Sequence, residues 1–142
     1  MKIDIVQFTA DHIDALRRVF LRARLLAFQS VANTDTFRLT DFDRAIEGET
    51  VIVALCDGKP VGFASWWQPD NFLHNLFIDP EYSYKGLGQM LLQRCLHSIG
   101  RPARLKCLVD NRNAIEFYQH FGWQLEATGQ SEDGDYALMV YH

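Results

Sequence analysis

Residues 72–92, with the sequence F-L-H-N-L-F-I-D-P-E-Y-S-Y-K-G-L-G-Q-M-L-L, decide the fold. The apolar first part predicts a strand that ends in a turn containing Pro80, and the last part predicts a helix that begins at about Gly88. The first amide groups of a helix have no acceptor inside the helix and lie at the positive end of its dipole. A strand, a glycine loop and a helix start in this order therefore predict a site for a phosphate-bearing ligand.

Length and composition indicate one folded domain over residues 1–142. Apolar residues make up 48% of the chain and aromatic residues 13%, which excludes a disordered protein. The net charge of −4 argues against nucleic acid as a partner. The first residues are too polar for a signal peptide, and no apolar run approaches about 18 residues. We therefore expect a cytoplasmic protein that does not bind a membrane.

The cysteines indicate reduced thiols. The chain has 3 cysteines, Cys56, Cys95 and Cys107, and none is in a C-x-x-C spacing. Neither a disulfide framework nor a metal site is predicted, and because all three lie in apolar segments, none is expected to be an activated nucleophile.

The remaining periodicity predicts a mixed α/β (α+β) domain. The predicted order is β-α-α-β-β-β-α-β-α-β-β, with a tight hairpin at Asp57-Gly58. Four arginines on the first helix are expected to form a solvated face: Arg17, Arg18, Arg22 and Arg24. The predicted strands cover residues 3–8, 50–56, 60–67, 72–78, 104–109, 123–130 and 135–142, and the helices cover residues 9–27, 40–48, 88–99 and 114–121.

The glycine pair alone is a weak signal, since a G-x-G is expected by chance in roughly every chain of this length. A Rossmann fingerprint would require a third glycine where Leu91 stands, and a Walker loop would require Gly-Lys-Ser/Thr. A doubly wound domain that binds NAD or ATP is therefore a minor alternative.

Two motifs together resemble the GNAT superfamily of acetyl-CoA-dependent N-acetyltransferases, over essentially the full chain. The first is Q/R-x-x-G-x-G/A after a strand that ends V-x-P, and here Ile78-Asp79-Pro80 precedes Ser83-Tyr84-Lys85-Gly86-Leu87-Gly88. Ser83 replaces the usual Gln or Arg. The second motif, N-x-x-A-x-x-F-Y-x-x-x-G-F/W, is met by Asn111, Ala114, Phe117, Tyr118, Gly122 and Trp123.

The resemblance implies the GNAT fold, with a mixed sheet of six or seven strands and helices on both faces. It also implies acetyl-CoA as co-substrate, with no metal. Leu76, Phe77 and Ile78 would separate from the next strand, bind the pantetheine arm and polarise the thioester. Asn111 would bind the arm from the other side, and Tyr118 would protonate the leaving thiolate. The pyrophosphate would be held by the backbone of Tyr84, Lys85, Gly86, Leu87, Gly88 and Gln89.

Structural roles compete with these functional ones. Asn111 and Asn113 are equally suited to cap a helix, and Tyr118 lies on the apolar side of its helix, where tyrosines commonly belong to the core. The glycines could serve the turn alone.

A base for the incoming amine is also expected. Deprotonating a lysine-like amine with a pKa of ~10.4 at pH 7 costs about 4–5 kcal/mol. Lys106 stands where the ribosomal-protein acetyltransferases of this superfamily carry a glutamate. His74 is the candidate: it precedes Ile78 by four residues, which predicts that both lie on the same sheet face. A structural histidine is the alternative.

The acceptor is predicted to be a primary amine of a small molecule or peptide. Aromatic residues that could line its pocket, or belong to the core instead, are Phe28, Phe37, Trp66 and Trp67, and acidic ones are Asp35, Asp41 and Asp70. The predicted reaction is direct attack in a ternary complex, by a monomer or homodimer. The alternative is a non-catalytic acyl-CoA-binding regulatory module with the same fold.

Overall fold

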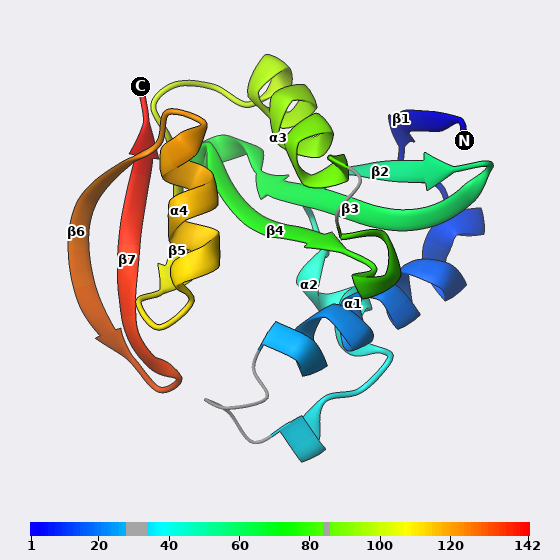
Figure 1. Cartoon of the computed structure of the whole chain (residues 1–142), viewed down its shortest axis with the longest axis horizontal. Helices are drawn as coiled ribbons and strands as arrows, with labels where there is room; N and C mark the ends of the chain where they lie inside the picture. The colour runs from blue at the N-terminus through cyan, green and yellow to red at the C-terminus, as the bar shows by residue number, and fades with distance from the viewer. Residues whose placement is uncertain (28–33, 84–85) are drawn as a thin grey trace.

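The computed structural model describes residues 1–27, 34–83 and 86–142. Within these residues one seven-stranded sheet has the order β1-β2-β3-β4-β5-β7-β6 (Figure 1). Neighbouring strands are antiparallel except β4 and β5, so the predicted mixed sheet and element order are confirmed, and a doubly wound parallel sheet is excluded. The strands are β1 Ile3–Gln7, β2 Thr50–Cys56, β3 Lys59–Trp67, β4 Phe72–Ile78, β5 Ala103–Leu108, β6 Gln124–Ser131 and β7 Gly134–Tyr141.

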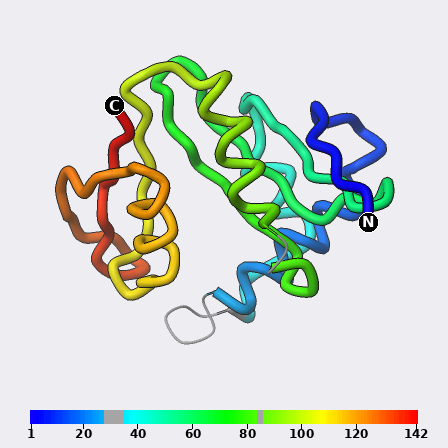
Figure 2. Tube along the Cα trace, turned by 45° about the horizontal axis from the view of Figure 1, so that its top comes forward, coloured from blue at the N-terminus to red at the C-terminus, as the bar shows by residue number. Residues whose placement is uncertain are grey.

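Helices cover both faces of the sheet, as expected. Helices α1 (Ile13–Ala27) and α2 (Asp41–Ala45) pack on one face through a cluster that includes Phe20, Phe42 and Phe63. Helices α3 (Leu87–Ser98) and α4 (Arg112–His120) pack on the other face, over a second cluster. Figure 2 shows α4 together with β6 and β7 on one side of the molecule and α3 nearer the middle.

The predicted hairpin between β2 and β3 is present. Asp57 has a φ of 50° and Gly58 a φ of 82°, both in the left-handed region. Positive φ at both central residues is the geometry of the turn that matches strand twist in two-residue hairpins. This hairpin sets the register between β2 and β3.

The arginines of α1 do not form a simple solvated face. Arg17 donates to Asp43 of α2 at 2.6 Å from its Nη2, and Arg24 donates to Asp41 of α2 at 3.2 Å. The Arg24 side chain is 12% exposed, and burial is the main reason why its pKa lies below the ordinary value. The prediction holds for the exposed Arg18. These two ion pairs attach α1 to α2.

A β-bulge interrupts the pairing of β3 with β4. Ser65 pairs with Asn75 and the adjacent Trp66 pairs with Leu73, so His74 is an extra residue on β4. An extra residue shifts the alternation of side chains from one sheet face to the other. The residues that follow the bulge therefore lie on the opposite face from the one expected for an uninterrupted strand.

Candidate active site

The parallel strands β4 and β5 separate after a single point of contact. Their register contains one pair, Phe72 with Arg104, and the Arg104 amide donates to the Asn71 carbonyl at 3.0 Å. Figure 1 shows the two strands close together where they begin and apart toward their ends. The separation predicted from the family resemblance is present, and it opens the sheet at its middle.

A cleft of about 490 Å³ lies at this separation. Its walls come from β4, β5, α4 and the β6–β7 hairpin. Leu76 and Phe77 line it as predicted, whereas Ile78 packs against the core on the α3 face and does not line the cleft. The cleft is also lined by His74, Lys106, Cys107, Asn111 and Tyr118.

The helix start next to β4 has the geometry expected of an anion site. Gly86 is the N-cap of α3 with a φ of 74°, and the helix begins at Leu87, one residue before the predicted start. The Met90 amide donates to the Gly86 carbonyl at 3.2 Å. The amides of Leu87, Gly88 and Gln89 come before this bond and have no acceptor inside the helix. Tyr84 and Lys85 lie outside the described residues.

Asn111 both caps α4 and lines the cleft. Its Oδ1 accepts a hydrogen bond from the Ala114 amide at 3.2 Å, so the predicted capping role is confirmed. The cap uses the carbonyl oxygen and leaves the side-chain NH₂ group available as a donor. Asn113 lies inside α4 and is not a cap, which corrects the alternative suggested for it.

Tyr118 is half-buried between aromatic rings. Its ring centroid is 5.2 Å from that of Phe117 and 5.7 Å from that of Trp123. Burial raises the pKa of the Tyr118 phenol well above its ordinary value, and the nearby Cys107 and Cys95 add to the shift. The phenol therefore remains protonated over the whole neutral range.

The cysteines near Tyr118 are poor nucleophiles. Burial raises the pKa of Cys95 to about 12 and that of Cys107 to about 11. Since the thiolate is the reactive form, these thiols are unsuited to carry an acetyl group. This supports the prediction that neither cysteine forms a covalent intermediate.

His74 forms a dyad with Glu49, a residue that the sequence did not single out. Its Nδ1 lies 2.8 Å from Glu49 Oε2. The contact lies on the α2 side of the sheet, whereas Ile78 packs on the α3 side. The prediction that His74 and Ile78 share a face is wrong, because the bulge at His74 changes the alternation. No local sequence pattern links Glu49 to His74. The pairing of β3 with both β2 and β4 brings the two residues together.

A second hollow, of about 320 Å³, adjoins His74 and is a candidate acceptor site. It is lined by Trp67, Asp70, Phe72, Leu73, His74 and Lys106.

Among the residues suggested for the acceptor pocket, only Trp67 and Asp70 line this hollow. Trp66 belongs to the core, where its Nε1 donates to Gln68 at 2.7 Å. Phe37 covers the guanidinium of Arg24 at 4.4 Å from its ring centre, and Asp41 accepts from the same arginine. Asp35 does not line the hollow, and Phe28 lies outside the described residues.

Comparison with known proteins identifies the family. Residues 47–125, more than half of the chain, match the model of the acetyltransferase (GNAT) domain. The chain belongs to the GNAT family of N-acetyltransferases. It is 30% identical, over 85 residues, to an uncharacterized N-acetyltransferase of Methanocaldococcus jannaschii. That match covers 51% of this chain and 38% of the relative, so this chain spans well under half of the relative's length.

Solved structures of GNAT proteins share the fold across nearly the whole chain. The PaiA N-acetyltransferase of Thermoplasma acidophilum, in complex with coenzyme A, is 17% identical with a TM-score of 0.82 and 100% of both chains covered. YncA of Salmonella typhimurium, a putative acetyltransferase with acetyl-CoA, is 19% identical with a TM-score of 0.73, covering 100% of this chain and 94% of the other. These likenesses confirm the GNAT fold. Among the described residues, the structure has no helix with the length and apolar character needed to span a membrane.

Proposed function

We propose that residues 1–142 form one N-acetyltransferase domain that moves the acetyl group of acetyl-CoA directly to a primary amine of a small molecule or peptide. One observation carries this proposal: the cleft between β4 and β5 is lined by both Tyr118 and His74. Tyr118 packs on the α3–α4 face of the sheet, and His74 is held on the α2 face. An acid and a base therefore approach one cleft from opposite faces, which places both within one site for general acid–base catalysis of the transfer.

The cleft residues fit acetyl-CoA, which when bound supplies a thioester carbonyl open to attack by an amine. The amides of Leu87, Gly88 and Gln89 would hold the pyrophosphate, and the Asn111 NH₂ group would donate to the pantetheine arm. The backbone of β4 beyond Phe72, which is not paired with β5, would bind the arm and polarise the carbonyl oxygen. The GNAT structures with coenzyme A and acetyl-CoA, PaiA and YncA, support this assignment.

Tyr118 would act as the general acid. Because burial keeps its phenol protonated, it can deliver a proton to the departing thiolate at neutral pH. The thiol of the leaving group has an ordinary pKa of about 8.5, below that of the phenol, so full transfer of the phenol proton is uphill and Tyr118 would act by donating a hydrogen bond to the departing sulfur. The role is therefore to stabilise the leaving sulfur as the bond to carbon breaks.

His74 would take the proton of the amine. It lines both the cleft and the adjoining hollow, so an amine that enters past Trp67 and Phe72 meets the imidazole before it meets the thioester. Deprotonating a lysine-like amine at pH 7 costs about 4–5 kcal/mol, and an imidazole is suited to accept that proton and to release it again to solvent near neutral pH.

A thiol-release assay with acetyl-CoA tests the proposal. The acceptor panel contains polyamines, arylalkylamines, amino acids, aminoglycosides and peptide N-termini, and mass spectrometry checks that the amine carries the acetyl group. We expect at least one class to release thiol, with intersecting initial-rate lines when both substrates are varied. The His74→Ala variant should lose most of this rate and keep its affinity for acetyl-CoA. Binding of acetyl-CoA with no transfer to any amine would instead favour the regulatory module.

A further inference from the structure

A polar network behind His74 extends into the core. Asn75 Nδ2 donates to the Ala45 carbonyl at 3.2 Å and to Ser65 Oγ at 2.7 Å. Ser65 Oγ donates to Glu49 Oε1 at 3.0 Å, and Glu49 Oε2 meets His74 Nδ1 at 2.8 Å. The network thus connects a backbone carbonyl of α2, through three side chains, to the candidate base.

The direction of each hydrogen bond in this network follows from its fixed end. A backbone carbonyl only accepts, so the Asn75 group that faces Ala45 is the NH₂ group, and it also donates to Ser65. The Ser65 hydroxyl has one proton and uses it to donate a hydrogen bond to Glu49. Glu49 therefore acts as an acceptor, and as a carboxylate it takes its second hydrogen bond from the Nδ1–H of His74. The Nε2 of the neutral ring is then left with its lone pair.

Burial makes the partnership of Glu49 and His74 strong. The Glu49 side chain is 4% exposed and the His74 side chain 46% exposed. A buried carboxylate requires hydrogen-bond donors, and here Ser65 and His74 supply them. The carboxylate side of this contact is shielded from water, whereas the imidazole keeps part of its surface in contact with solvent. The Phe72 ring, with its centroid 4.8 Å from that of His74, restricts the imidazole further.

We propose that Glu49 is a positioning residue that holds His74 as the Nδ1–H tautomer, with Nε2 directed to the cleft to receive the proton of the amine. The proposal rests on the proposed acetyl transfer and extends it, because it assigns the orientation of the base to a residue more than twenty positions away in sequence. The same logic applies to the acidic member of a Ser-His-Asp triad, which fixes the tautomer of its histidine and stabilises the imidazolium.

The Glu49→Gln variant tests the proposal. Glutamine keeps the size of the side chain, but its NH₂ group can donate to Nδ1 and so favours the opposite tautomer. We expect kcat to fall by about 10²-fold or more, with an unchanged KM for acetyl-CoA. The control is Glu47→Gln, which alters an exposed glutamate two residues away and should leave kcat unchanged.

Nitrogen-15 NMR of the histidine rings gives a readout that does not depend on activity. His74 is assigned among the 5 histidines by the signal that His74→Gln removes. The wild-type ring should carry its proton on Nδ1 and the Glu49→Gln ring on Nε2. If the wild-type protein acetylates no amine, the proposed function is wrong. The NMR result would still show whether Glu49 fixes the tautomer of His74.

Two results would overturn the proposal: a wild-type kcat in Glu49→Gln, or the same His74 tautomer in both proteins. If Glu49→Gln does not fold, Ser65→Ala takes its place. It removes one of the two donors to Glu49, and we expect a fall in kcat of about tenfold, with the Nδ1–H signal weakened. An unchanged rate and spectrum in Ser65→Ala would overturn the proposal equally.

Discussion

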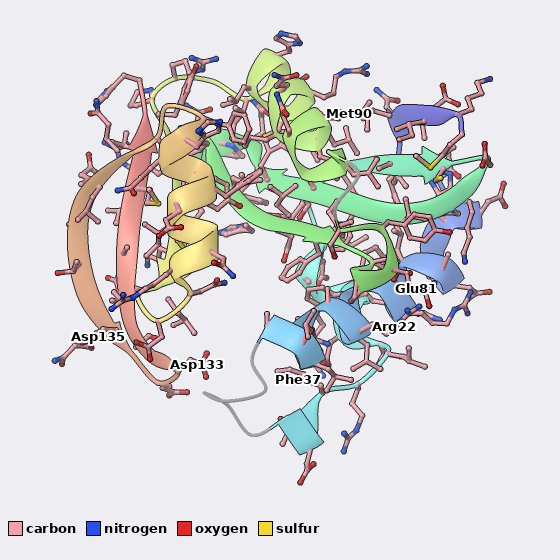
Figure 3. All side chains as sticks on the ribbon, viewed as in Figure 1. Arg22, Phe37, Glu81, Met90, Asp133 and Asp135 are labelled. Atoms are coloured by element: carbon pink, nitrogen blue, oxygen red, sulfur yellow. The ribbon has the colours of Figure 1, made fainter. Side chains whose placement is uncertain are left out.

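Arg22 of α1 holds Asp79, the carboxylate that follows β4, with two nitrogens of its guanidinium. Nη1 donates to Oδ2 and Nη2 lies by Oδ1, both at 3.2 Å, and Nη2 also lies 3.1 Å from Glu81. Figure 3 shows Arg22 and Glu81 side by side. The Asp79 side chain is 3% exposed, and its Oδ1 accepts from the Glu81 amide. This ion pair therefore fixes the turn that leads from β4 to the loop before α3.

Arg22→Ala should loosen this turn. Removing one partner of a buried pair costs about 3–5 kcal/mol, but Arg22 is 43% exposed and water screens part of the interaction, so we expect about 1–2 kcal/mol. The melting temperature should fall by about 3–6 °C, and the KM for acetyl-CoA should rise while that for the amine does not change. Arg18→Ala, an exposed change on the same helix, is the control. An unaltered KM for acetyl-CoA would show that the turn does not position the loop.

Local sequence patterns were sufficient for much of the fold and for one side of the site. Asn111 and the Asp57-Gly58 turn have short-range causes, namely a helix cap and a hairpin, and both were found where the sequence predicted them, while the helix after the glycine loop begins one residue before its predicted start. Tyr118 and Asn111 reach the cleft because the α4 motif fixes their spacing on one helix.

The other side of the site depends on long-range register. Glu49, just before β2, meets His74 of β4 because β3 pairs with both strands, and one extra residue in β4 puts His74 on the face opposite Ile78. A shift of one residue reverses which face a side chain occupies, and no pattern in residues 72–78 predicts the bulge that causes this shift. Both Trp66 and Trp67 were suggested for the acceptor pocket from the sequence, but the structure places Trp66 in the core.

Tyr118→Phe should lower turnover without weakening cofactor binding. The phenol is the proposed proton donor to the leaving sulfur, and a general acid commonly contributes about 10²–10⁴-fold. The loss should be greatest at low pH, because above the ordinary thiol pKa of about 8.5 the thiolate needs no proton. Steady-state kinetics and calorimetric titration with acetyl-CoA measure the two effects, with Tyr141→Phe as the control outside the cleft. Unchanged turnover would remove Tyr118 from the mechanism.

The raised pKa of Tyr118 also predicts an alkaline loss of stability. Below a pH of about 10, the ordinary tyrosine pKa, both folded and unfolded chains hold the proton. Above it the unfolded chain binds fewer protons than the folded one, so the free energy of unfolding falls as pH rises toward the folded-state pKa, with a slope of up to about 1.4 kcal/mol per pH unit. Urea unfolding between pH 9 and about 11 should show a shallower fall in Tyr118→Phe than in the wild type. Equal slopes would contradict the burial of a neutral phenol.

Lys106 should select against acceptors with several positive charges. It lines both the cleft and the hollow, and its Nζ lies 4.7 Å from the centre of the Tyr136 ring. Two like charges about 8 Å apart in a water-rich site repel by about 0.5–1 kcal/mol, or about two- to fivefold in KM. Lys106→Ala should therefore lower the KM of a diamine and raise that of an amino acid with a free carboxylate. Lys106→Arg keeps the charge and should change neither, and the proposed selectivity fails if Lys106→Ala shifts both constants in one direction.

Gly86 and Gly88 should respond differently to alanine. Gly86 has a φ of 74°, so Gly86→Ala adds strain of about 1–2 kcal/mol and lowers stability even in the free protein. A Cβ on Gly88 would meet the Phe117 ring at 3.5 Å, an ordinary contact inside a helix, so Gly88→Ala should be at least as stable as the wild type. Its methyl group would nonetheless stand where a pyrophosphate approaches the backbone, and the Kd for acetyl-CoA should rise by about tenfold or more. Urea unfolding and calorimetry separate the two effects. A wild-type Kd in Gly88→Ala would mean that the phosphates do not rest on the first turn of α3.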